Sequence, residues 1–355
     1  MERATVEAYD RRGATWAARR RPVRAGDARA FGAGLDPRAR RIDLGCGAGR
    51  YLGDLGTPAV GVDASATMLG LCRDAVPGVP VVLGDLEALP FGQQTFDAAW
   101  ANMSYLHLPR PRLPGALAQL HAVLAPGAPL DIQVLAGDYE GDALPQDDVG
   151  GRFFAAWSPA RLDDVLVGAG FDPEAVTVDD DVVRARARRA RTLADTVGAG
   201  MRLLLVGLNP SLFAADAGVA FARPGNRFWP AAVAAGMTER ARDPWHLWRV
   251  HGVGMTDVVK RATRSAAELA PGEYRSGMDR VTRLVEWLAP GAVCFVGLSA
   301  WRAARHPSAA AGIQPQGLGG RPVYVMPSTS GANAHATPAA LTEHLRAAMA
   351  LAAAA

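Results

Sequence analysis

The feature that most constrains the fold of this chain is a glycine-rich segment, Asp43-Leu44-Gly45-Cys46-Gly47-Ala48-Gly49-Arg50, which joins an apolar run to a helix-like stretch. The apolar run, residues 41–44, has the composition of a buried strand. Glycines in such a turn let a ligand approach the backbone at the N-terminus of the following helix. The segment therefore predicts a strand–turn–helix unit, whose turn is either a site for a nucleotide-type cofactor or a structural loop.

Short apolar runs alternate with helix-like stretches from residue 41 to residue 189, which is typical of a parallel sheet with crossover helices. We expect strands at residues 41–44, 59–62, 80–83, 96–100 and 130–135, followed by a closing hairpin over residues 175–189. The first half of the chain is therefore predicted to be a doubly wound, Rossmann-like α/β fold with seven strands.

A second series of strands is expected at residues 201–207, 292–297 and 322–326. It predicts a smaller parallel sheet between helices, a three-layer α/β/α fold. With 355 residues the chain is long enough for two or three domains, and no long flexible linker is visible near residue 190. We expect one domain over residues 1–191 and a second over residues 192–355.

Composition excludes several classes of protein. No run of ~18 apolar residues is present, so a transmembrane helix is not expected, and the N-terminus lacks the apolar core of a signal peptide. The three cysteines are odd in number and far apart in sequence, which argues against a disulfide scaffold and a four-cysteine metal site. We expect a cytoplasmic protein with no membrane partner and no metal.

Charge is unevenly distributed behind the formal net value of +3. Residues 51–181 carry 5 basic and 19 acidic residues, whereas residues 196–355 carry 16 basic and 9 acidic residues. A polyanion would be repelled by the first stretch and attracted to the second. Arginine supplies 37 of the 38 basic residues, so the arginine-rich arm (Arg19, Arg20, Arg21 and Arg24) is interpreted as a solvated helix face.

Acidic residues stand at or near the ends of the first three predicted strands. Asp43 is the last but one residue of the first strand, Asp63 ends the second, and Asp85 follows the third. The carboxyl ends of parallel strands meet at one edge of a sheet, which is where such folds bind ligands. In this position, the carboxylate of Asp63 can accept hydrogen bonds from both hydroxyls of a ribose.

These segments resemble the class I S-adenosylmethionine-dependent methyltransferases over roughly residues 5–190. The matching segments are residues 43–49, Val62-Asp63, residues 84–91, Phe96-Asp97 and Leu124-Ala125-Pro126-Gly127. The resemblance implies that the cofactor is S-adenosylmethionine, that the glycine turn cradles its methionine part, that Asp63 binds the ribose, and that Asp85 and Leu86 hold the adenine. The expected cofactor-binding residues are Asp43, Gly45, Gly47, Gly49, Asp63, Asp85 and Leu86.

A nicotinamide dehydrogenase is the alternative for this half, but its G-x-G-x-x-G pattern needs a third glycine where Arg50-Tyr51-Leu52 stands. The methyl acceptor is not identified. Asn102, Tyr105 and His107 follow the fourth strand and border the expected acceptor pocket, although Tyr105 and His107 are equally compatible with packing roles. Methyl transfer needs little beyond in-line positioning and desolvation, so no universal catalytic residue is expected.

The second half places an amide, an aromatic ring and a hydroxyl-rich loop after its strands. They are Asn209 in Gly207-Leu208-Asn209-Pro210-Ser211, Phe221 in Phe221-Ala222-Arg223-Pro224-Gly225-Asn226, and residues 326–335. That set fits an enzyme that extrudes a base from a DNA duplex. Residues 192–349 resemble the mismatch-specific uracil/thymine-DNA glycosylases of the uracil-DNA glycosylase superfamily.

The resemblance implies that double-stranded DNA with a G·U or G·T mismatch is the substrate. Asn209 then orients the attacking water and Phe221 stacks on the flipped base. The expected DNA-binding residues are Ser328, Ser330, Gly331, Ala332 and Asn333. A lysine-based lyase step would depend on Lys260 alone, so we expect a monofunctional glycosylase.

Two positions depart from the pattern of the family. Ser211 stands where several relatives have glycine, and Ala332 stands where relatives have a bulkier leucine or arginine that enters the gap left by the base. Both departures leave open a domain that binds DNA without cutting the glycosidic bond.

Two clusters are not interpreted as metal sites. Asp142, Asp147 and Asp148 are expected to be solvated in a loop, and Trp245, His246, Trp248 and His251 lack zinc-like spacing with cysteine and are interpreted as packing residues. The arginines of Arg184-Ala185-Arg186-Ala187-Arg188 share one face of a strand and are interpreted as a solvated sheet edge facing the second domain.

The prediction is a bifunctional fusion of a methyltransferase and a mismatch-type DNA glycosylase. One rival is a small-molecule methyltransferase with a non-catalytic, DNA-binding second half. Another is a degenerate methyltransferase that senses its cofactor beside an active glycosylase.

Overall fold

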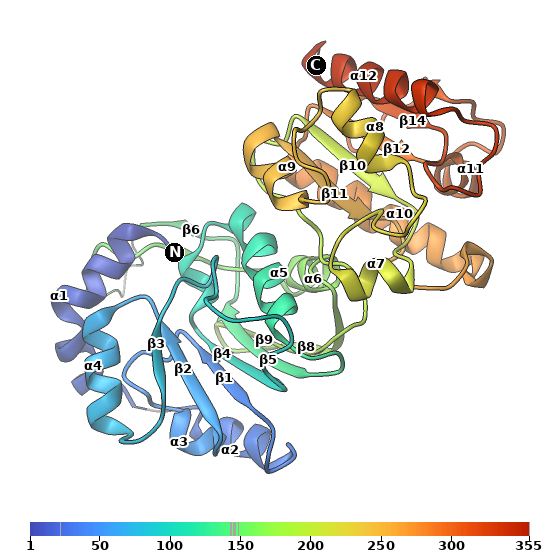
Figure 1. The fold of residues 1–355 in the computed structure, drawn as a ribbon. Coiled ribbons are helices and arrows are strands. Elements are labelled where there is room, and N and C mark those ends of the chain that lie inside the picture. The colour runs from blue at the N-terminus through green and yellow to red at the C-terminus, as the bar shows by residue number, and fades with distance from the viewer. Residues whose placement is uncertain (22, 143, 145–146, 148, 355) are drawn as a thin grey trace. The chain divides into compact units, whose positions relative to one another are not determined.

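The computed structural model describes residues 1–21, 23–142, 144, 147 and 149–354. The chain forms two compact units. The first holds Met1–Val167 and Phe171–Ala190, and the second holds Gly168–Gly170 and the chain from Arg191 on. Each unit has its own sheet and its own core, and each is described by itself (Figure 1).

A seven-stranded sheet forms the centre of the first unit. Its strands are β1 (Arg41–Leu44), β2 (Ala59–Asp63), β3 (Val81–Leu83), β4 (Ala98–Asn102), β5 (Pro129–Leu135), β8 (Phe171–Asp179) and β9 (Val182–Arg189). Their order is β3-β2-β1-β4-β5-β9-β8; the first five run parallel, and β9 and β8 pair antiparallel. The predicted Rossmann-like, seven-stranded fold is confirmed. The chain order reverses between β1 and β4, and ligands bind at such switch points.

The helices of the first unit follow from apolar stripes and caps. They are α1 (Arg3–Arg19), α2 (Ala25–Ala33), α3 (Leu52–Leu55), α4 (Ala66–Ala75), α5 (Leu113–Val123) and α6 (Pro159–Gly168), with 3₁₀ turns η1 (Tyr105–His107) and η2 (Arg110–Arg112) and a small ribbon of β6 (Glu140–Gly141) and β7 (Phe154–Ala155). Ser65 caps α4 by accepting a hydrogen bond from the Met68 amide at 3.2 Å, and α4 buries Met68, Leu69 and Cys72.

Strand β9 corrects one prediction about arginines. The Arg184–Arg188 alternation is not a sheet edge, because β9 lies between β5 and β8. One face of β9 buries Val183, Ala185 and Ala187. On the other face, Arg184 binds the fully buried Asp131 carboxylate of β5 at 2.6 Å. The alternation thus marks an internal strand with one apolar and one charged face.

A five-stranded sheet forms the centre of the second unit. Its strands are β10 (Leu203–Gly207), β11 (Val253–Asp257), β12 (Ala292–Val296), β13 (Gly312–Ile313) and β14 (Val323–Met326). The order is β11-β10-β12-β14-β13, with β13 antiparallel and the others parallel. Strands β11 and β13 were not predicted. Strand β11, Val-Gly-Met-Thr-Asp, is buried throughout and shows no alternation of apolar and polar residues.

Helices cover both faces of this second sheet. They are α7 (Leu212–Ala217), α8 (Phe228–Ala234), α9 (Pro244–His251), α10 (Pro271–Leu288), α11 (Leu298–Ala304) and α12 (Pro338–Ala354), with the 3₁₀ turn η3 (Ala266–Glu268). Leu204 and Val206 of β10 pack with residues of α10 and α11. Leu203 and Leu205 pack with residues of α8, α9 and α12. Alternate residues of one strand thus fill two cores, which is the predicted α/β/α layering.

Within the part of the chain that the structure describes, no helix combines the length and apolar character that a membrane crossing requires. The three cysteines are buried free thiols.

Candidate functional sites

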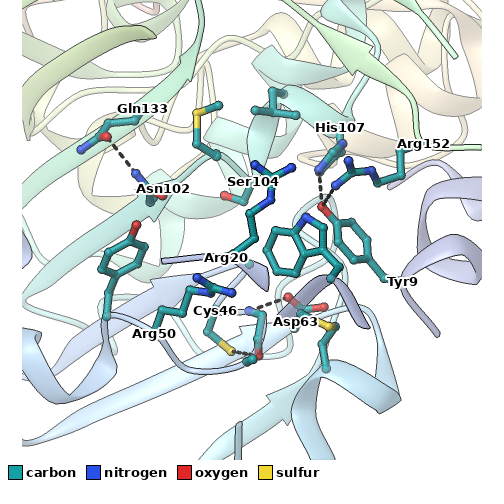
Figure 2. Close-up of a pocket in the computed structure, with 18 of the residues that line it drawn as sticks. Tyr9, Arg20, Cys46, Arg50, Asp63, Asn102, Ser104, His107, Gln133 and Arg152 are labelled. Atoms are coloured by element: carbon teal, nitrogen blue, oxygen red, sulfur yellow. Dashed lines mark hydrogen bonds between the residues drawn. The ribbon is translucent and has the colours of Figure 1, made fainter. Parts of the chain in front are cut away.

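A cavity of about 630 Å³ lies at the carboxyl ends of β1, β2 and β4 in the first unit. Its floor is the turn after β1, and its walls include side chains of α1 and of the arm that follows α1 (Figure 2). Asp43, Gly45, Gly47 and Asp63 are among the lining residues, so the structure brings four of the seven predicted cofactor residues together.

Two positions of the turn must be glycine, because a side chain at either one would clash with a neighbouring residue. Gly45 has φ +69°, and a Cβ there would lie 2.3 Å from the Cβ of Ser104. Gly49 has φ +78°, and a Cβ there would lie 2.6 Å from the sulfur of Cys72 on α4. Gly45 therefore keeps the cavity floor close to Ser104, whereas Gly49, which is outside the cavity lining, allows the turn to pack on α4.

Asp63 joins the glycine turn to helix α4. Its Oδ2 accepts a hydrogen bond from the Gly47 amide and its Oδ1 accepts one from the Ser65 amide, both at 2.9 Å. Burial raises the pKa of Asp63, and the backbone amides that donate to it oppose that rise. Each carboxylate oxygen has two lone pairs, so Asp63 retains acceptor capacity toward a ligand.

Asp43 carries a polar atom that lacks a protein partner. Its Oδ2 is buried and has no hydrogen bond to any described residue. Burial raises the pKa of Asp43 well above its ordinary value, and the Cys72 and Asp63 side chains add to the rise. Buried polar atoms normally have a hydrogen-bond partner, so an unpaired one in a residue that lines a cavity is a candidate to bind a ligand. The residues present therefore fit a cofactor with hydroxyl or amine donors.

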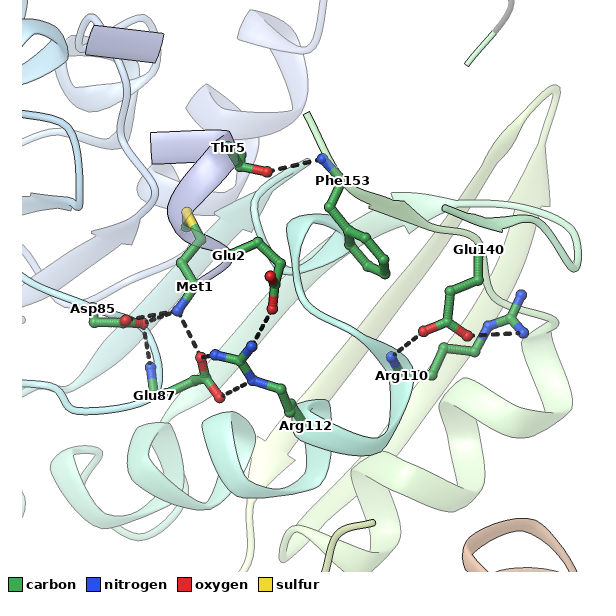
Figure 3. Close-up of polar contacts among 9 residues, drawn as sticks. All are labelled: Met1, Glu2, Thr5, Asp85, Glu87, Arg110, Arg112, Glu140 and Phe153. Atoms are coloured by element: carbon green, nitrogen blue, oxygen red, sulfur yellow. Dashed lines mark hydrogen bonds and ion pairs between the residues drawn. The ribbon is translucent and has the colours of Figure 1, made fainter. Parts of the chain in front are cut away.

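Asp85 and Leu86 do not line this cavity in the described part of the chain. The Asp85 carboxylate accepts hydrogen bonds from the α-amino group of Met1 at 2.6 and 2.7 Å (Figure 3). The neighbouring Glu87 forms an ion pair with Arg112, which also binds Glu2. Leu86 is buried in the core. These two predicted cofactor residues therefore lie outside the group of four that lines the cavity, Asp85 in an ion-pair network and Leu86 in the core.

One wall of the cavity was missed by sequence reasoning because it comes from α1. The Tyr9 hydroxyl lies 3.0 Å from His107 Nε2 and 3.0 Å from Arg152 Nη1 (Figure 2). His107 Nδ1 lies 2.7 Å from the Phe153 carbonyl, which can only accept. The proton of neutral His107 is therefore on Nδ1, and Nε2 accepts the Tyr9 O–H. Burial lowers the pKa of His107 to about 4, so the His107 imidazole is uncharged near neutral pH.

The loop before Arg152 was expected to hold solvated aspartates, which is right for the exposed Asp142 and wrong for Asp147. Asp147 is not solvated: its side chain is 2% exposed and forms an ion pair with Arg152, which is 5% exposed. Asp148 lies outside the described residues. Asp147 thus orients the Arg152 guanidinium toward Tyr9. Spacing along the chain offered no signal for this pair, because many aspartates have an arginine five residues away.

The residues proposed for the acceptor pocket separate into two groups. Asn102 and His107 line the cavity, and Asn102 donates to Gln133 at 2.8 Å. Tyr105 is buried away from the cavity lining and packs in the core. In the arginine-rich arm, Arg19, Arg20 and Arg21 are exposed as expected, whereas Arg24 is half-buried; all four also border the cavity. The cavity-lining arginines are Arg19, Arg20, Arg21, Arg24, Arg50 and Arg152.

In the second unit, Asn209 follows β10, and hydrogen bonds fix the position of its side-chain amide nitrogen. Its Nδ2 lies 2.8 to 3.2 Å from the Thr263 hydroxyl and from the carbonyls of Pro210 and Arg261. The two carbonyls can only accept, so the amide orientation follows from its surroundings. Its carbonyl oxygen is the end left to accept a hydrogen bond from water.

Phe221 has the geometry of a stacking platform. Its ring stacks on Phe228 with centroids 4.4 Å apart and planes at 27°, and its φ of +56° is uncommon for a non-glycine residue. The Trp229 indole N–H donates to the neighbouring Ala220 carbonyl at 2.8 Å. These contacts fix the ring without covering it fully, since Phe221 is half-buried.

Asp257 is a further candidate that sequence reasoning did not assign. Gly207 pairs with Asp257 across β10 and β11. A Cβ on Gly207 would lie 2.2 Å from Asp257 Oδ1 and 3.7 Å from the Phe221 ring. Burial raises the pKa of Asp257 to about 6, against the opposing charges of Lys260 and Arg280. A buried carboxyl beside the predicted stacking ring is a signal that only tertiary contacts reveal.

The predicted DNA-binding loop is exposed and braced by one arginine. Arg227 donates to the carbonyls of Ser330 and Asn333 at 2.9 and 2.7 Å. The Ser328 hydroxyl accepts from the Ser330 amide, and the Ser330 hydroxyl accepts from the Ala332 amide, both at 3.3 Å. Both serines retain an O–H that can donate to a phosphate.

Ser211 and Lys260 have structural partners. The Ser211 hydroxyl caps α7 by accepting from the Ala214 amide at 3.1 Å. Lys260 Nζ binds Asp195 at 2.7 Å, and Arg280 binds the same carboxylate at 2.9 Å. Lys260 is 10% exposed and Asp195 is 2% exposed. A lysine held in a buried ion pair is a poor amine nucleophile.

Comparisons with known families match both units. Residues 42–127 match the family described as "Methyltransferase domain", and residues 194–350 match the "Uracil DNA glycosylase superfamily". The chain thus joins a methyltransferase domain to a domain of the uracil-DNA glycosylase superfamily.

Several solved methyltransferases are similar to this chain. The Burkholderia thailandensis 1,6-didemethyltoxoflavin-N1-methyltransferase, solved with 1,6-didemethyltoxoflavin and S-adenosylhomocysteine, is 22% identical over 53% of this chain and 88% of its own, with a TM-score of 0.43. The DhpI–SAH complex is 22% identical over 53% of this chain and 96% of its own, with a TM-score of 0.44. A Thermotoga maritima protein described as a possible histamine N-methyltransferase is 19% identical over 52% and 99%, with a TM-score of 0.41.

Proposed function

We propose that residues 1–191 transfer a methyl group from S-adenosylmethionine to an acceptor, and that residues 192–355 remove uracil hydrolytically from mismatched duplex DNA. The observation that supports the first activity is the pair of acidic side chains in the cavity lining, the buried Asp43 and the half-buried Asp63. The observation that supports the second is the grouping of Asn209, Phe221 and Asp257 around the carboxyl ends of β10 and β11.

In the first unit, S-adenosylmethionine would supply an electrophilic methyl group on its sulfonium. Asp63 would accept hydrogen bonds from ribose hydroxyls, and the buried Asp43 Oδ2 would accept a donor from the cofactor. The turn from Gly45 to Gly49 would lie against the methionine part. The hydrogen-bonded wall of Tyr9, His107 and Arg152 would exclude water from the acceptor and orient it.

Binding of S-adenosylmethionine tests this assignment. In an isothermal titration of the full chain, Asp63→Ala is expected to weaken binding about tenfold or more, because it removes charge-assisted hydrogen bonds. Asp74→Ala changes an exposed aspartate on the neighbouring helix α4 and is expected to bind as the unaltered chain does. Equal affinity in both variants, with both folded by circular dichroism, would place the cofactor elsewhere.

A small anionic acceptor is the substrate class that the cavity favours. Six arginines line it, together with the aromatic side chains of Tyr9, Trp16 and Phe154. With radiolabelled methyl donor, we expect label in small molecules that carry an acidic group and none in duplex DNA, which the acidic stretch of this unit repels. Label in DNA would contradict this and would couple the two activities directly.

In the second unit, cleavage breaks the bond between deoxyribose C1′ and uracil N1, and the electron pair leaves with the base. The sugar becomes oxocarbenium-like, and water adds to C1′ to give free uracil and an abasic site. Asn209 positions that water through its carbonyl oxygen, and ionised Asp257 is the group suited to accept its proton. The ion pair of Lys260 with Asp195 supports a monofunctional mechanism, because it withholds the chain's only lysine.

Base release from a labelled duplex with one G·U pair tests this mechanism, with G·T and single-stranded uracil as comparison substrates. Asn209→Ala is expected to slow release by about a hundredfold or more, because water is no longer positioned. Gln316→Ala removes an exposed amide of the same unit and is expected to leave the rate unchanged. Duplex binding without release in the unaltered chain would support the rival in which this domain only binds DNA.

A further inference from the structure

A cluster of two histidines and one glutamate lies in the second unit, apart from the groups discussed above. Glu239 lies on the segment between α8 and α9, His246 lies within α9, and His251 is the last residue of α9. His246 Nε2 is 2.5 Å from Glu239 Oε1, and His251 Nε2 is 2.7 Å from Glu239 Oε2. One ligand atom from each residue lies within 4.8 Å of the other two. The two Nε2 atoms therefore point at the two oxygens of one carboxylate.

Spacing along the chain does not predict this grouping, because the histidines are five residues apart and no cysteine is near. The packing interpretation applies to the tryptophans of the same segment. Trp248 packs against a core cluster, and its ring centroid lies 5.7 Å from that of Trp245. The two histidines instead have their rings 5.3 Å apart and turned toward Glu239. The expectation of no metal partner rested on spacing alone.

The backbone that carries these ligands is held at both ends of α9. Asp243 caps the start of the helix by accepting from the His246 amide at 2.9 Å. Gly252, in the left-handed conformation, ends it. Arg202 donates to the His251 carbonyl at 2.7 and 3.0 Å. Two of the three ligands are thus attached to a helix whose termini are fixed, so little ordering remains to be done on binding.

The charge of the cluster favours a divalent cation. Glu239 contributes a carboxylate whose two oxygens each lie beside the Nε2 atom of one histidine. Two neutral imidazoles and one carboxylate are a common ligand set for zinc, with water as the fourth ligand. Zinc bonds of ~2.0–2.2 Å to tetrahedral ligands place them roughly 3.3 Å apart. The present Nε2–oxygen separations are 2.5 and 2.7 Å, so Glu239 must move slightly away from the histidines to bind zinc with them. Its side chain is 61% exposed, which leaves room for that movement.

We propose that Glu239, His246 and His251 bind one zinc ion that ties the segment after α8 to helix α9. The site adjoins the start of β11, whereas Asp257 ends that strand, about 13 Å further along at ~3.3 Å per residue. At that distance along β11 the zinc ion takes no direct part in base release. Arg242, three residues after Glu239, donates to the Ala222 carbonyl at 2.8 Å. The tied segment thus also braces the loop that carries Phe221.

Metal content tests the site directly. The untagged full chain is stripped with a chelator, incubated with zinc sulfate, desalted and measured by mass spectrometry of the metal. We expect one zinc per chain. Glu239→Gln and His251→Ala are expected to weaken zinc affinity at least tenfold. Glu239→Gln keeps the size and exposure of the side chain, so a loss of binding there does not arise from unfolding. His306→Ala removes an exposed histidine and is expected to change nothing.

Cobalt provides a second readout, which distinguishes metal bound at the tetrahedral site from metal bound elsewhere on the chain. Co²⁺ in a tetrahedral site gives strong visible absorption bands, which we expect in the unaltered chain and in His306→Ala but not in Glu239→Gln. Less than a tenth of an equivalent of zinc, or equal affinity in the unaltered chain and Glu239→Gln, would overturn the proposal. Base release at the same rate with and without zinc agrees with the structural role, and release that requires zinc would refute it.

Discussion

Asp43 and Asp257 are buried carboxyls at the carboxyl ends of parallel strands, one in each unit. Burial raises the pKa of both. Their surroundings differ: Asp43 faces Cys72 and Asp63, which disfavour its ionised form, whereas Asp257 also faces the charges of Lys260 and Arg280. Asp257 therefore titrates near neutral pH, where a group that receives a proton during catalysis is most useful.

The pH dependence of uracil release should report Asp257. Its pKa is about 6, and only the ionised form can take the proton of the attacking water. The single-turnover rate is therefore expected to rise with pH through about 6 and then to level off. Asp257→Asn should release uracil slowly and lose this rise. The same profile in Asp257→Asn as in the unaltered chain would assign the titration to another group.

The same substitution should stabilise the fold. Because the pKa of Asp257 is raised in the folded state, stability is lost as pH rises from the ordinary value of 3.8 through about 6. At neutral pH this amounts to ~3 kcal/mol, which Asp257→Asn is expected to recover in urea denaturation. No gain in stability would mean that the carboxylate is better solvated than its burial indicates.

At the scale of elements, burial differs among the ion pairs of a single strand, and it determines how much each pair contributes to stability. Strand β9 carries arginines on one face, and the strand is internal. Arg184 pairs with Asp131, whose side chain is fully buried, whereas Arg188 pairs with Glu174 and both of those side chains are about half exposed. Pairs on the same strand therefore experience very different dielectric surroundings.

Two substitutions that remove a carboxylate beside β9 should separate these environments. Asp131→Ala leaves Arg184 without its buried partner and is expected to cost about 3 kcal/mol of unfolding free energy. Glu174→Ala breaks a surface pair and is expected to cost under ~1 kcal/mol. Urea denaturation of both variants measures the difference. Equal losses would show that the Asp27 carboxylate, which also binds Arg184, replaces Asp131.

At the scale of the whole molecule, the chain contains two compact units with separate sheets and separate cores. The family matches fall one on each unit. Each unit therefore has what a domain needs in order to unfold cooperatively.

Ligands should act on the units one at a time. In calorimetry we expect two transitions, and S-adenosylhomocysteine at about a hundred times its dissociation constant should stabilise the first unit by ~2.7 kcal/mol and leave the other transition unchanged. Asp63→Ala identifies the first unit, because it should abolish that shift. A single transition, or an equal shift in both, would mean that the units unfold together.

The amino-acid sequence by itself determined the strand–turn–helix units, the Rossmann-like order of the first half and the glycine turn with Asp43 and Asp63. Those features depend on residues that are neighbours in the chain, where periodicity and turn chemistry act. It also placed Asn209 directly after its strand and singled out Phe221 further along the chain, and the roles of both residues are predictions.

Only the tertiary structure decided which distant groups meet. Tyr9 and Arg152 are 143 positions apart and share a hydrogen bond. Asp85 pairs with the amino group of Met1, which is 84 positions away. Glu239 lies beside two histidines whose spacing along the chain does not predict a shared site. Such contacts follow from the packing of whole elements against one another, because ion pairing and ligand geometry act through space and not along the chain.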